Sequence, residues 1–252
     1  MNDNKSPVLG ILGGLGPMAT AYFYELLISH TQAERDQDHI DIIINSHATT
    51  PDRTAFITGR SDEDPLAVMV DDIRRMKTYG ADLVAIPCNT AHYFYDKLKA
   101  STDLPILNIM EETAAKLASL GVCRAGILAT DGTVYSGTYD RFLSEFGIDC
   151  IRPSVDDQKH IMRIIYDEIK NGKTPDVDTF LTISAHLRAA GADVLILGCT
   201  ELSLIKKQFS LPPYYIDSLD VLAAATILAC GKTPVGFDFS VDFTTENKEI
   251  HP

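Results

Sequence analysis

The 252-residue sequence is short of basic side chains, with 22 Lys and Arg against 35 Asp and Glu and a formal net charge of −13. Because phosphate groups are bound by basic surfaces, this balance argues against nucleic acid or an anionic membrane as a partner. A small anionic substrate remains compatible with an acidic exterior, since a cleft responds mainly to its nearest charges.

Long apolar segments are also absent. The longest apolar run, VLAAATILAC at 221–230, is too short to span a bilayer. The opening MNDNKSP has no apolar core of the kind that a signal peptide needs. We therefore expect a cytoplasmic protein.

Cysteines are few and lie far apart in the sequence. They are Cys88, Cys123, Cys150, Cys199 and Cys230. An odd count without a CxxC pair argues against a disulfide framework and against a zinc or redox site. No compact spacing of ligand residues is present, so we expect reduced thiols and no metal.

Apolar runs of strand length alternate with segments of helical spacing along the chain. Strands are predicted at 8–12, 39–47, 81–88, 104–109, 124–130, 148–153, 192–199 and 214–218. Helices are predicted at 18–34, 64–80, 89–100, 111–121, 134–147, 157–172, 176–191, 200–209 and 221–231. This alternation predicts an α/β protein with parallel sheets that are covered by helices.

The sequence repeats itself. GADLVAIPCNTAHY at 80–93 matches GADVLILGCTELSL at 191–204, which places Cys88 and Cys199 at equivalent positions 111 residues apart. GILGGLGP from Gly10 likewise resembles GILATDGT from Gly126. We predict two similar lobes related by a pseudo-twofold axis, with the active site between them.

The lobes are assigned by the spacing of these repeats. The first lobe is predicted at 1–108 and the second at 109–217. The helix at 218–231 is expected to pack back on the first lobe, and 232–252 to form a polar tail.

Each repeated cysteine ends a predicted strand, at the edge of a parallel sheet where ligands bind. Asn89, Thr90 and Thr200 follow as helix N-cap residues, so free N–H groups should favour a thiolate and bind a carboxylate. Cysteines that confront each other across a cleft suit inversion at a carbon, because one thiolate removes a proton and the other thiol delivers one.

These motifs resemble the cofactor-independent aspartate/glutamate racemases, and within them the aspartate racemase branch. The resemblance runs from GILGGLGPMAT through PCNTAH to LGCTEL. It implies two α/β lobes, no pyridoxal phosphate or other cofactor, a homodimer, and Cys88 with Cys199 as the acid/base pair.

The resemblance also implies binding residues. Arg53 in TTPDRT is similar to the anchor of the substrate's distal carboxylate, a contact that suits a guanidinium fork. Lys170 matches by spacing the lysine of aspartate racemases. Asn89, Thr90 and Thr200 are expected to hold the α-carboxylate and ammonium groups, and Gly14 and Met18 of the first loop also to bind substrate.

Other interpretations remain open. The first loop lacks the Asp-Ser pair of cell-wall glutamate racemases, which favours aspartate or a broad acidic specificity over glutamate alone. A hydantoin racemase, a maleate isomerase, a decarboxylase or a non-catalytic binding protein would share much of this plan. Gly14-x-Gly16-x-x-Ala19 fits a dinucleotide fingerprint, but the second strand ends in Asn45 and Ser46 where an acid is expected.

Overall fold

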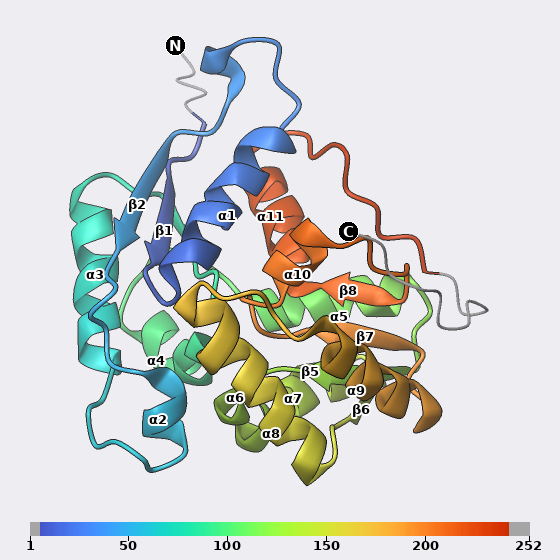
Figure 1. The fold of residues 1–252 in the computed structure, drawn as a ribbon. Coiled ribbons are helices and arrows are strands. Elements are labelled where there is room, and N and C mark those ends of the chain that lie inside the picture. The colour runs from blue at the N-terminus through green and yellow to red at the C-terminus, as the bar shows by residue number, and fades with distance from the viewer. Residues whose placement is uncertain (1–5, 242–252) are drawn as a thin grey trace.

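Two four-stranded parallel sheets organise the part of the chain that the structure, a computed structural model, describes, residues 6–241 (Figure 1). The first sheet has the order β2-β1-β3-β4 and the second the order β6-β5-β7-β8. Because the order is the same in both sheets, the sequence repeat is matched by a repeat in topology. The predicted α/β class with two helix-flanked parallel sheets is confirmed.

The first half of the chain builds the first sheet. Its strands are β1 (Leu9–Gly13), β2 (Ile42–Ser46), β3 (Leu83–Ala85) and β4 (Ile106–Leu107). Its helices are α1 (Pro17–Ser29), α2 (Arg53–Ile57), α3 (Leu66–Thr78) and α4 (Tyr95–Ala100), with the short 3-10 helices η1 (Asp36–Asp38) and η2 (Thr90–Phe94).

The second half builds the second sheet. Its strands are β5 (Arg124–Leu128), β6 (Asp149–Ile151), β7 (Val194–Leu197) and β8 (Tyr215–Asp217). Its helices are α5 (Ile109–Ser119), α6 (Asp131–Ser136), α7 (Thr138–Glu145), α8 (Val155–Arg163), α9 (Val177–Ala189), α10 (Ser203–Gln208) and α11 (Ser218–Ala229). The π-helical η3 (Ile164–Glu168) and the 3-10 helix η4 (Ile169–Asn171) follow α8.

Alternate strand residues enter different hydrophobic clusters, as the period of two in a strand requires. In β7, Val194 and Ile196 face a central cluster, whereas Leu195 and Leu197 face the cluster beneath α8 and α9. Leu12 of β1 faces a third cluster on the α3 and α4 side. The strands are therefore apolar on both faces, which explains their continuous apolar sequence.

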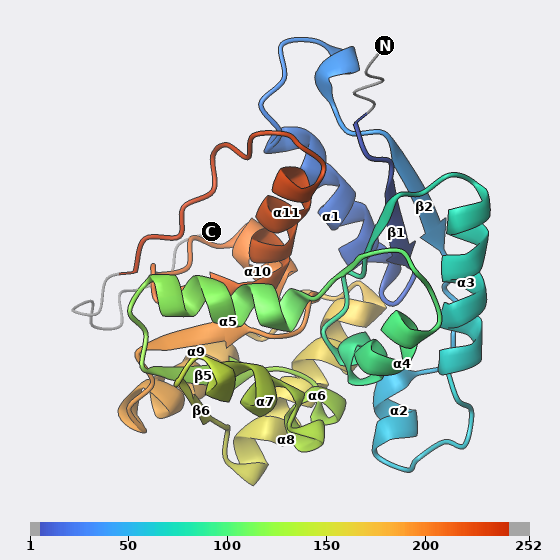
Figure 2. The ribbon, with the colours of Figure 1, turned by 180° about the vertical axis from the view of Figure 1, so that it is seen from behind.

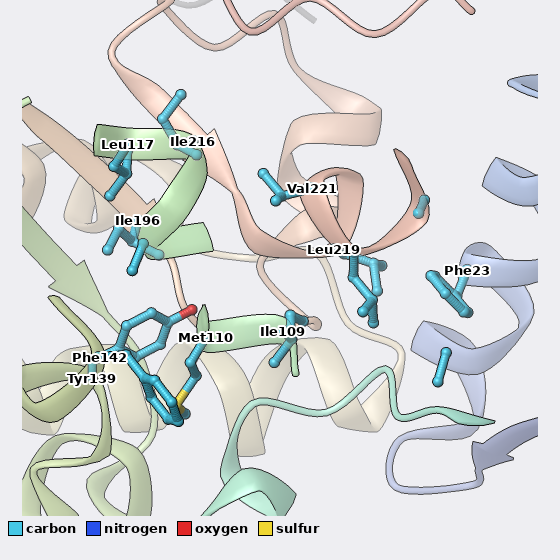
Figure 3. Close-up of a cluster of buried hydrophobic side chains, with 14 of the residues drawn as sticks. Phe23, Ile109, Met110, Leu117, Tyr139, Phe142, Ile196, Ile216, Leu219 and Val221 are labelled. Atoms are coloured by element: carbon cyan, nitrogen blue, oxygen red, sulfur yellow. The ribbon is translucent and has the colours of Figure 1, made fainter. Parts of the chain in front are cut away.

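The central cluster joins the two sheets into one core. It combines side chains of β1 and β3 with those of β5, β7 and β8, and helices α1, α5, α7 and α11 contribute most of the others. In Figure 3, Phe23 of α1 lies near Leu219 of α11, and Ile109 and Met110 of α5 lie between these residues and Phe142 of α7. The two halves thus share buried apolar surface.

Helix α11 packs against α1 and α5, between the two sheets (Figure 2). Residues beyond it also contact this region: Thr31 pairs with Pro234, and Phe237 stacks on His30 with 4.2 Å between ring centroids. Residues 242–252 of the predicted tail lie outside the described residues. The boundary between residues 108 and 109 stays a prediction, as do the other domain limits. No helix within residues 6–241 is long and apolar enough to cross a membrane.

Several predicted elements differ from the structure. The strand predicted at 39–47 is shorter in the structure, as the half-exposed edge strand β2 that pairs with β1 alone among the described strands. The helix predicted at 134–147 is interrupted at Gly137, which adopts φ of 66° and ends α6. The helix predicted at 157–172 changes to a π-helical turn after Arg163. Helices α2 and η1 were not predicted.

Asp217 lies buried where β8 meets α11. Its Oδ1 accepts hydrogen bonds from Ser203 Oγ at 2.8 Å and from Leu219 N–H at 2.9 Å, while Oδ2 has no hydrogen-bond partner among the described residues. Burial, with repulsion from Asp220, raises the pKa of Asp217 to about 7, against an opposing effect of Lys206. The protonated acid is therefore favoured in the folded protein.

This carboxyl should make stability depend on pH. Its folded pKa lies above its unfolded pKa, so its contribution is full below the unfolded value of 3.8 and is lost as pH rises through about 7. In the parent, this effect should lower the free energy of unfolding by about 2 to 4 kcal/mol between acidic and neutral pH. Asp217→Asn should abolish this decrease, so its curve of unfolding free energy against pH should be flatter. Urea unfolding across this range measures the effect, with the exposed Asp178→Asn as control. Parallel curves for Asp217→Asn and the parent would contradict this assignment.

Candidate active site

Both repeated cysteines line one small cavity between the two sheets. The cavity is lined by Leu15, Arg53, Thr54, Cys88, Asn89, Thr90, Thr130, Tyr166, Lys170, Cys199, Thr200 and Glu201. Seven of the nine residues predicted to form the site therefore meet here, from both halves of the chain. The other two, Gly14 and Met18, line a larger adjoining cleft of about 430 Å³.

The cavity itself is small. Its volume of about 10 Å³ has room for about one water molecule. Leu15, Arg53, Lys170 and Glu201 form the wall that it shares with the larger cleft. An amino acid can therefore bind between the cysteines only if these walls move apart.

Cys199 follows β7 and its thiol is buried. Its Sγ–H donates to Glu201 Oε2 at 2.9 Å. Burial, then the charge of Glu201, raises the pKa of Cys199 well above its usual value, against the opposing effect of Lys170. The expectation of a thiol pKa lowered by a helix N-terminus is wrong for this residue, because burial and the charge of Glu201 raise the pKa and a turn separates Cys199 from α10, which begins at Ser203.

Cys88 follows β3 and lies in a segment held by His92. The His92 Nδ1 is 2.9 Å from the Cys88 carbonyl oxygen, and Ile109 N–H donates to His92 Nε2 at 3.3 Å. Burial lowers the pKa of His92, so the neutral imidazole is favoured. His92 thus acts as a hydrogen-bonding link between the Cys88 segment and the start of α5.

The polar residues after the two cysteines are held by contacts across the halves. The Asn89 side chain accepts from Tyr139 O–H at 2.7 Å and donates to Ser218 Oγ at 3.0 Å. Thr200 Oγ1 donates to the Pro87 carbonyl oxygen at 3.3 Å. The predicted N-cap role of the Asn89 side chain is wrong, since these partners occupy it and it makes no capping hydrogen bond.

A cluster of threonine hydroxyls forms another wall of the cavity. Thr90 Oγ1 lies 2.9 Å from Thr130 Oγ1 and 3.0 Å from Thr133 Oγ1. Thr54 Oγ1 donates to Thr130 Oγ1 at 3.2 Å. Because each hydroxyl can both donate and accept, this buried cluster can turn its hydrogens towards a bound anion.

Arg53 is the first residue of α2 and is buried, with 7% of its surface exposed. Its terminal nitrogens donate to the backbone carbonyls of Leu15, Thr50 and Pro51 at 2.6 to 3.2 Å. Its Nε has no partner, and no ion pair joins it to a carboxylate within residues 6–241. A buried guanidinium without a counter-charge favours the binding of an anion.

Lys170, in η4, faces the cavity from the second half of the chain. Its Nζ lies 3.6 Å from Glu201 Oε1 and 4.3 Å from the centroid of the Tyr166 ring. Burial, the largest single effect, disfavours the ammonium ion, but Glu201, Tyr166 and the two cysteines together outweigh burial and raise the pKa of Lys170. Tyr166 O–H donates in turn to Asp52 Oδ2 at 3.0 Å, which links η3 to the N-terminus of α2.

The first loop approaches its neighbours closely. Gly14 has φ of 82°, and a Cβ there would lie 2.4 Å from His47 N. Its N–H donates to Thr20 Oγ1 at 2.9 Å and is thus satisfied within the protein. The loop therefore shapes the cleft through tight backbone packing.

Sequence reasoning missed Leu15, Thr54, Thr130, Tyr166 and Glu201 as cavity residues. The sequence did indicate two of these residues. Thr130 occupies the position of Gly14 when GILATDGT is aligned with GILGGLGP, and Glu201 is the next letter after Thr200. Within residues 6–241, no group of three or more His, Cys, Asp or Glu side chains is arranged to hold a metal.

Comparison with known proteins decides the family. The family model "Asp/Glu/Hydantoin racemase" matches residues 12–226, which includes every residue of the cavity. The chain belongs to this family. The family found by resemblance is confirmed, and so is the class of enzyme, an isomerase of the racemase type that acts on amino acids.

Individual relatives of this family member agree in sequence and fold. The structure of the aspartate racemase of Picrophilus torridus superposes with a TM-score of 0.78 at 32% identity, over 91% of this chain and 96% of that one. The broad specificity amino-acid racemase RacX of Bacillus subtilis is 28% identical over 87% of this chain and 96% of its own length. A glutamate racemase of Haemophilus influenzae is 29% identical over 58% of this chain and 55% of its own.

Proposed function

We propose that this family member interconverts the enantiomers of aspartate without a cofactor, and that Cys88 and Cys199 exchange protons with opposite faces of the α-carbon. The observation that carries the proposal is the convergence of both cysteines and the unpaired Arg53 on one cavity. The likeness to the Picrophilus torridus aspartate racemase supports the choice of substrate.

The proposed reaction needs two groups of opposite protonation. One thiolate forms an S–H bond with the α-proton while the C–H electron pair moves into the α-carboxylate. The electron pair then returns from the α-carboxylate to the carbon and forms a C–H bond on the opposite face with the proton of the other thiol, whose S–H electron pair stays on sulfur. Each turnover therefore leaves the two sulfurs with exchanged protonation states.

Three groups of contacts would hold the substrate. Arg53 would bind the distal carboxylate through Nε–H and the remaining hydrogen of Nη2. Thr90 and Thr200, with Asn89, would position the α-carboxylate and the ammonium group. Lys170 would contribute positive charge at the boundary with the cleft, through which we expect the substrate to enter.

The direct test is chiral chromatography of L-aspartate incubated with the protein and without added cofactor. We expect D-aspartate to form until the two enantiomers are equal. L-Glutamate in a parallel incubation measures the acidic specificity, and L-alanine serves as a control that should not react. A protein that binds aspartate without forming D-aspartate would contradict the proposal and favour a binding protein or another isomerase of this family.

A homodimer and a cytoplasmic location are further parts of this proposal, drawn from the resemblance and from the composition. Light scattering of the purified protein tests the first. A mass of one chain, 27.6 kDa, would contradict it.

A further inference from the structure

Glu201 connects Cys199 with the cleft. Its Oε2 accepts the Cys199 Sγ–H at 2.9 Å, and its side chain lines both the small cavity and the larger cleft. Only 7% of the side chain is exposed. Glu201 thus occupies the boundary between the buried thiol and a space of about 430 Å³.

The surroundings of Glu201 allow a charged carboxylate to stay at this boundary. Oε1 has no hydrogen-bond partner among the described residues, but Lys170 Nζ lies 3.6 Å away. Gly16 provides the space, because a Cβ at that position would lie 2.4 Å from Oε1. A buried carboxylate oxygen that accepts no hydrogen bond is costly even beside an ammonium ion, so its place here calls for a physical reason.

A two-base racemisation creates a need for such a group. After each turnover the sulfurs have exchanged protonation states, and the free protein must exchange them back before the same enantiomer reacts again. Cys199 is buried, and the cavity admits about one water molecule. While the cavity walls are in place, proton exchange between Cys199 and solvent therefore requires a polar group that reaches both.

We propose that Glu201 carries the proton between Cys199 and water in the cleft, an inference that rests on the proposed function. The Cys199 S–H bond breaks with its electron pair left on sulfur, and the proton forms an O–H bond with Oε2 of Glu201. The carboxylic acid then releases a proton to water in the cleft, and reprotonation follows the reverse order.

Charge around the pair supports this route. Burial and the Glu201 carboxylate favour the protonated thiol, so Cys199 keeps its proton in the free protein. Transfer of that proton neutralises Glu201 and leaves Lys170 as the nearby charge that stabilises the thiolate. Glu201 acts through Cys199 and not on the substrate, so it is a positioning residue.

The test is the kinetics of Glu201→Gln, which keeps the shape of the side chain but cannot carry the proton. Return of the free protein to its starting state should become slow and limit kcat, which we expect to fall about 10-fold or more. The ratio kcat/KM excludes this step and should fall much less. Inhibition of the L-to-D reaction by added D-aspartate should change from competitive to noncompetitive, and higher buffer concentration should reduce the noncompetitive component.

Two further variants keep the test decisive. Gly16→Ala retains the carboxylate but crowds Oε1, so it should show the same kinetic pattern. It takes the place of Glu201→Gln in the test if that variant does not fold. Glu112→Gln, at a half-buried acid on α5 outside the cavity, is the matched control and should behave as the parent.

The outcomes separate this inference from the proposed function. A racemase whose Glu201→Gln and Gly16→Ala variants keep the parental kcat and competitive product inhibition would overturn the role of Glu201 alone. A parent that does not racemise aspartate or glutamate would remove both.

Discussion

Replacement of either cysteine by serine should abolish racemisation while leaving hydrogen exchange with one enantiomer. A serine hydroxyl is a far weaker acid and base than a thiol with a pKa of about 8.5. Loss of one general acid or base costs about 10²- to 10⁴-fold in rate, so Cys88→Ser and Cys199→Ser should each lose at least about 10²-fold in kcat.

The remaining thiolate gives the diagnostic result. It still meets one face of the α-carbon, so it can remove the hydrogen of one enantiomer and return a proton from solvent to the same face. In D₂O the two single variants should therefore incorporate deuterium with opposite preferences for L- and D-aspartate. The double variant should incorporate none. Full racemisation by both single variants, or the same preferred enantiomer for both, would contradict two separate bases.

Removal of the Arg53 guanidinium should raise KM for aspartate about 10- to 150-fold, because each charge-assisted hydrogen bond contributes about 1.5 to 3 kcal/mol. The buried guanidinium has no ion pair within residues 6–241, so a bound carboxylate would supply its counter-charge. Steady-state kinetics of Arg53→Ala measure the effect. Arg53→Lys keeps the charge without the planar fork and should lie between the parent and Arg53→Ala.

A control is needed because Arg53 also holds the backbone of Leu15, Thr50 and Pro51. Discrimination between aspartate and its neutral amide asparagine isolates the charge. If Arg53 binds the distal carboxylate, the ratio of kcat/KM for the two should fall in Arg53→Ala. An unchanged ratio, with a lower thermal midpoint, would assign Arg53 a structural role only.

The architecture could be predicted from the sequence because the repeated segments contain continuous apolar strands, which are typical of parallel sheets buried on both faces. The boundaries of individual helices were less predictable. The positive φ of Gly137 splits one helix, and the π-helical turn after Arg163 changes another. Neither effect is contained in the spacing of apolar residues, since both depend on how the segment packs against its neighbours.

Residues of the candidate site were predictable where they follow the end of a strand or occupy equivalent positions in the sequence repeat. Cys88, Cys199 and Thr200 are such residues, and the structure brings them together with Arg53 and Lys170. Tyr166 carried no such signal, because its contact with Asp52 joins residues 114 positions apart. The environment of Cys199 was also unpredictable, since the effect of Glu201 depends on the turn that follows β7.

The most direct test of the two-cysteine account is racemisation of L-aspartate by the parent protein in D₂O, stopped at low conversion, with separation of the enantiomers and mass spectrometry of each. Two bases on opposite faces predict that the D-aspartate formed carries deuterium at the α-carbon while the remaining L-aspartate carries almost none. A single base that serves both faces would place deuterium in both pools from the start, and that result would contradict the account.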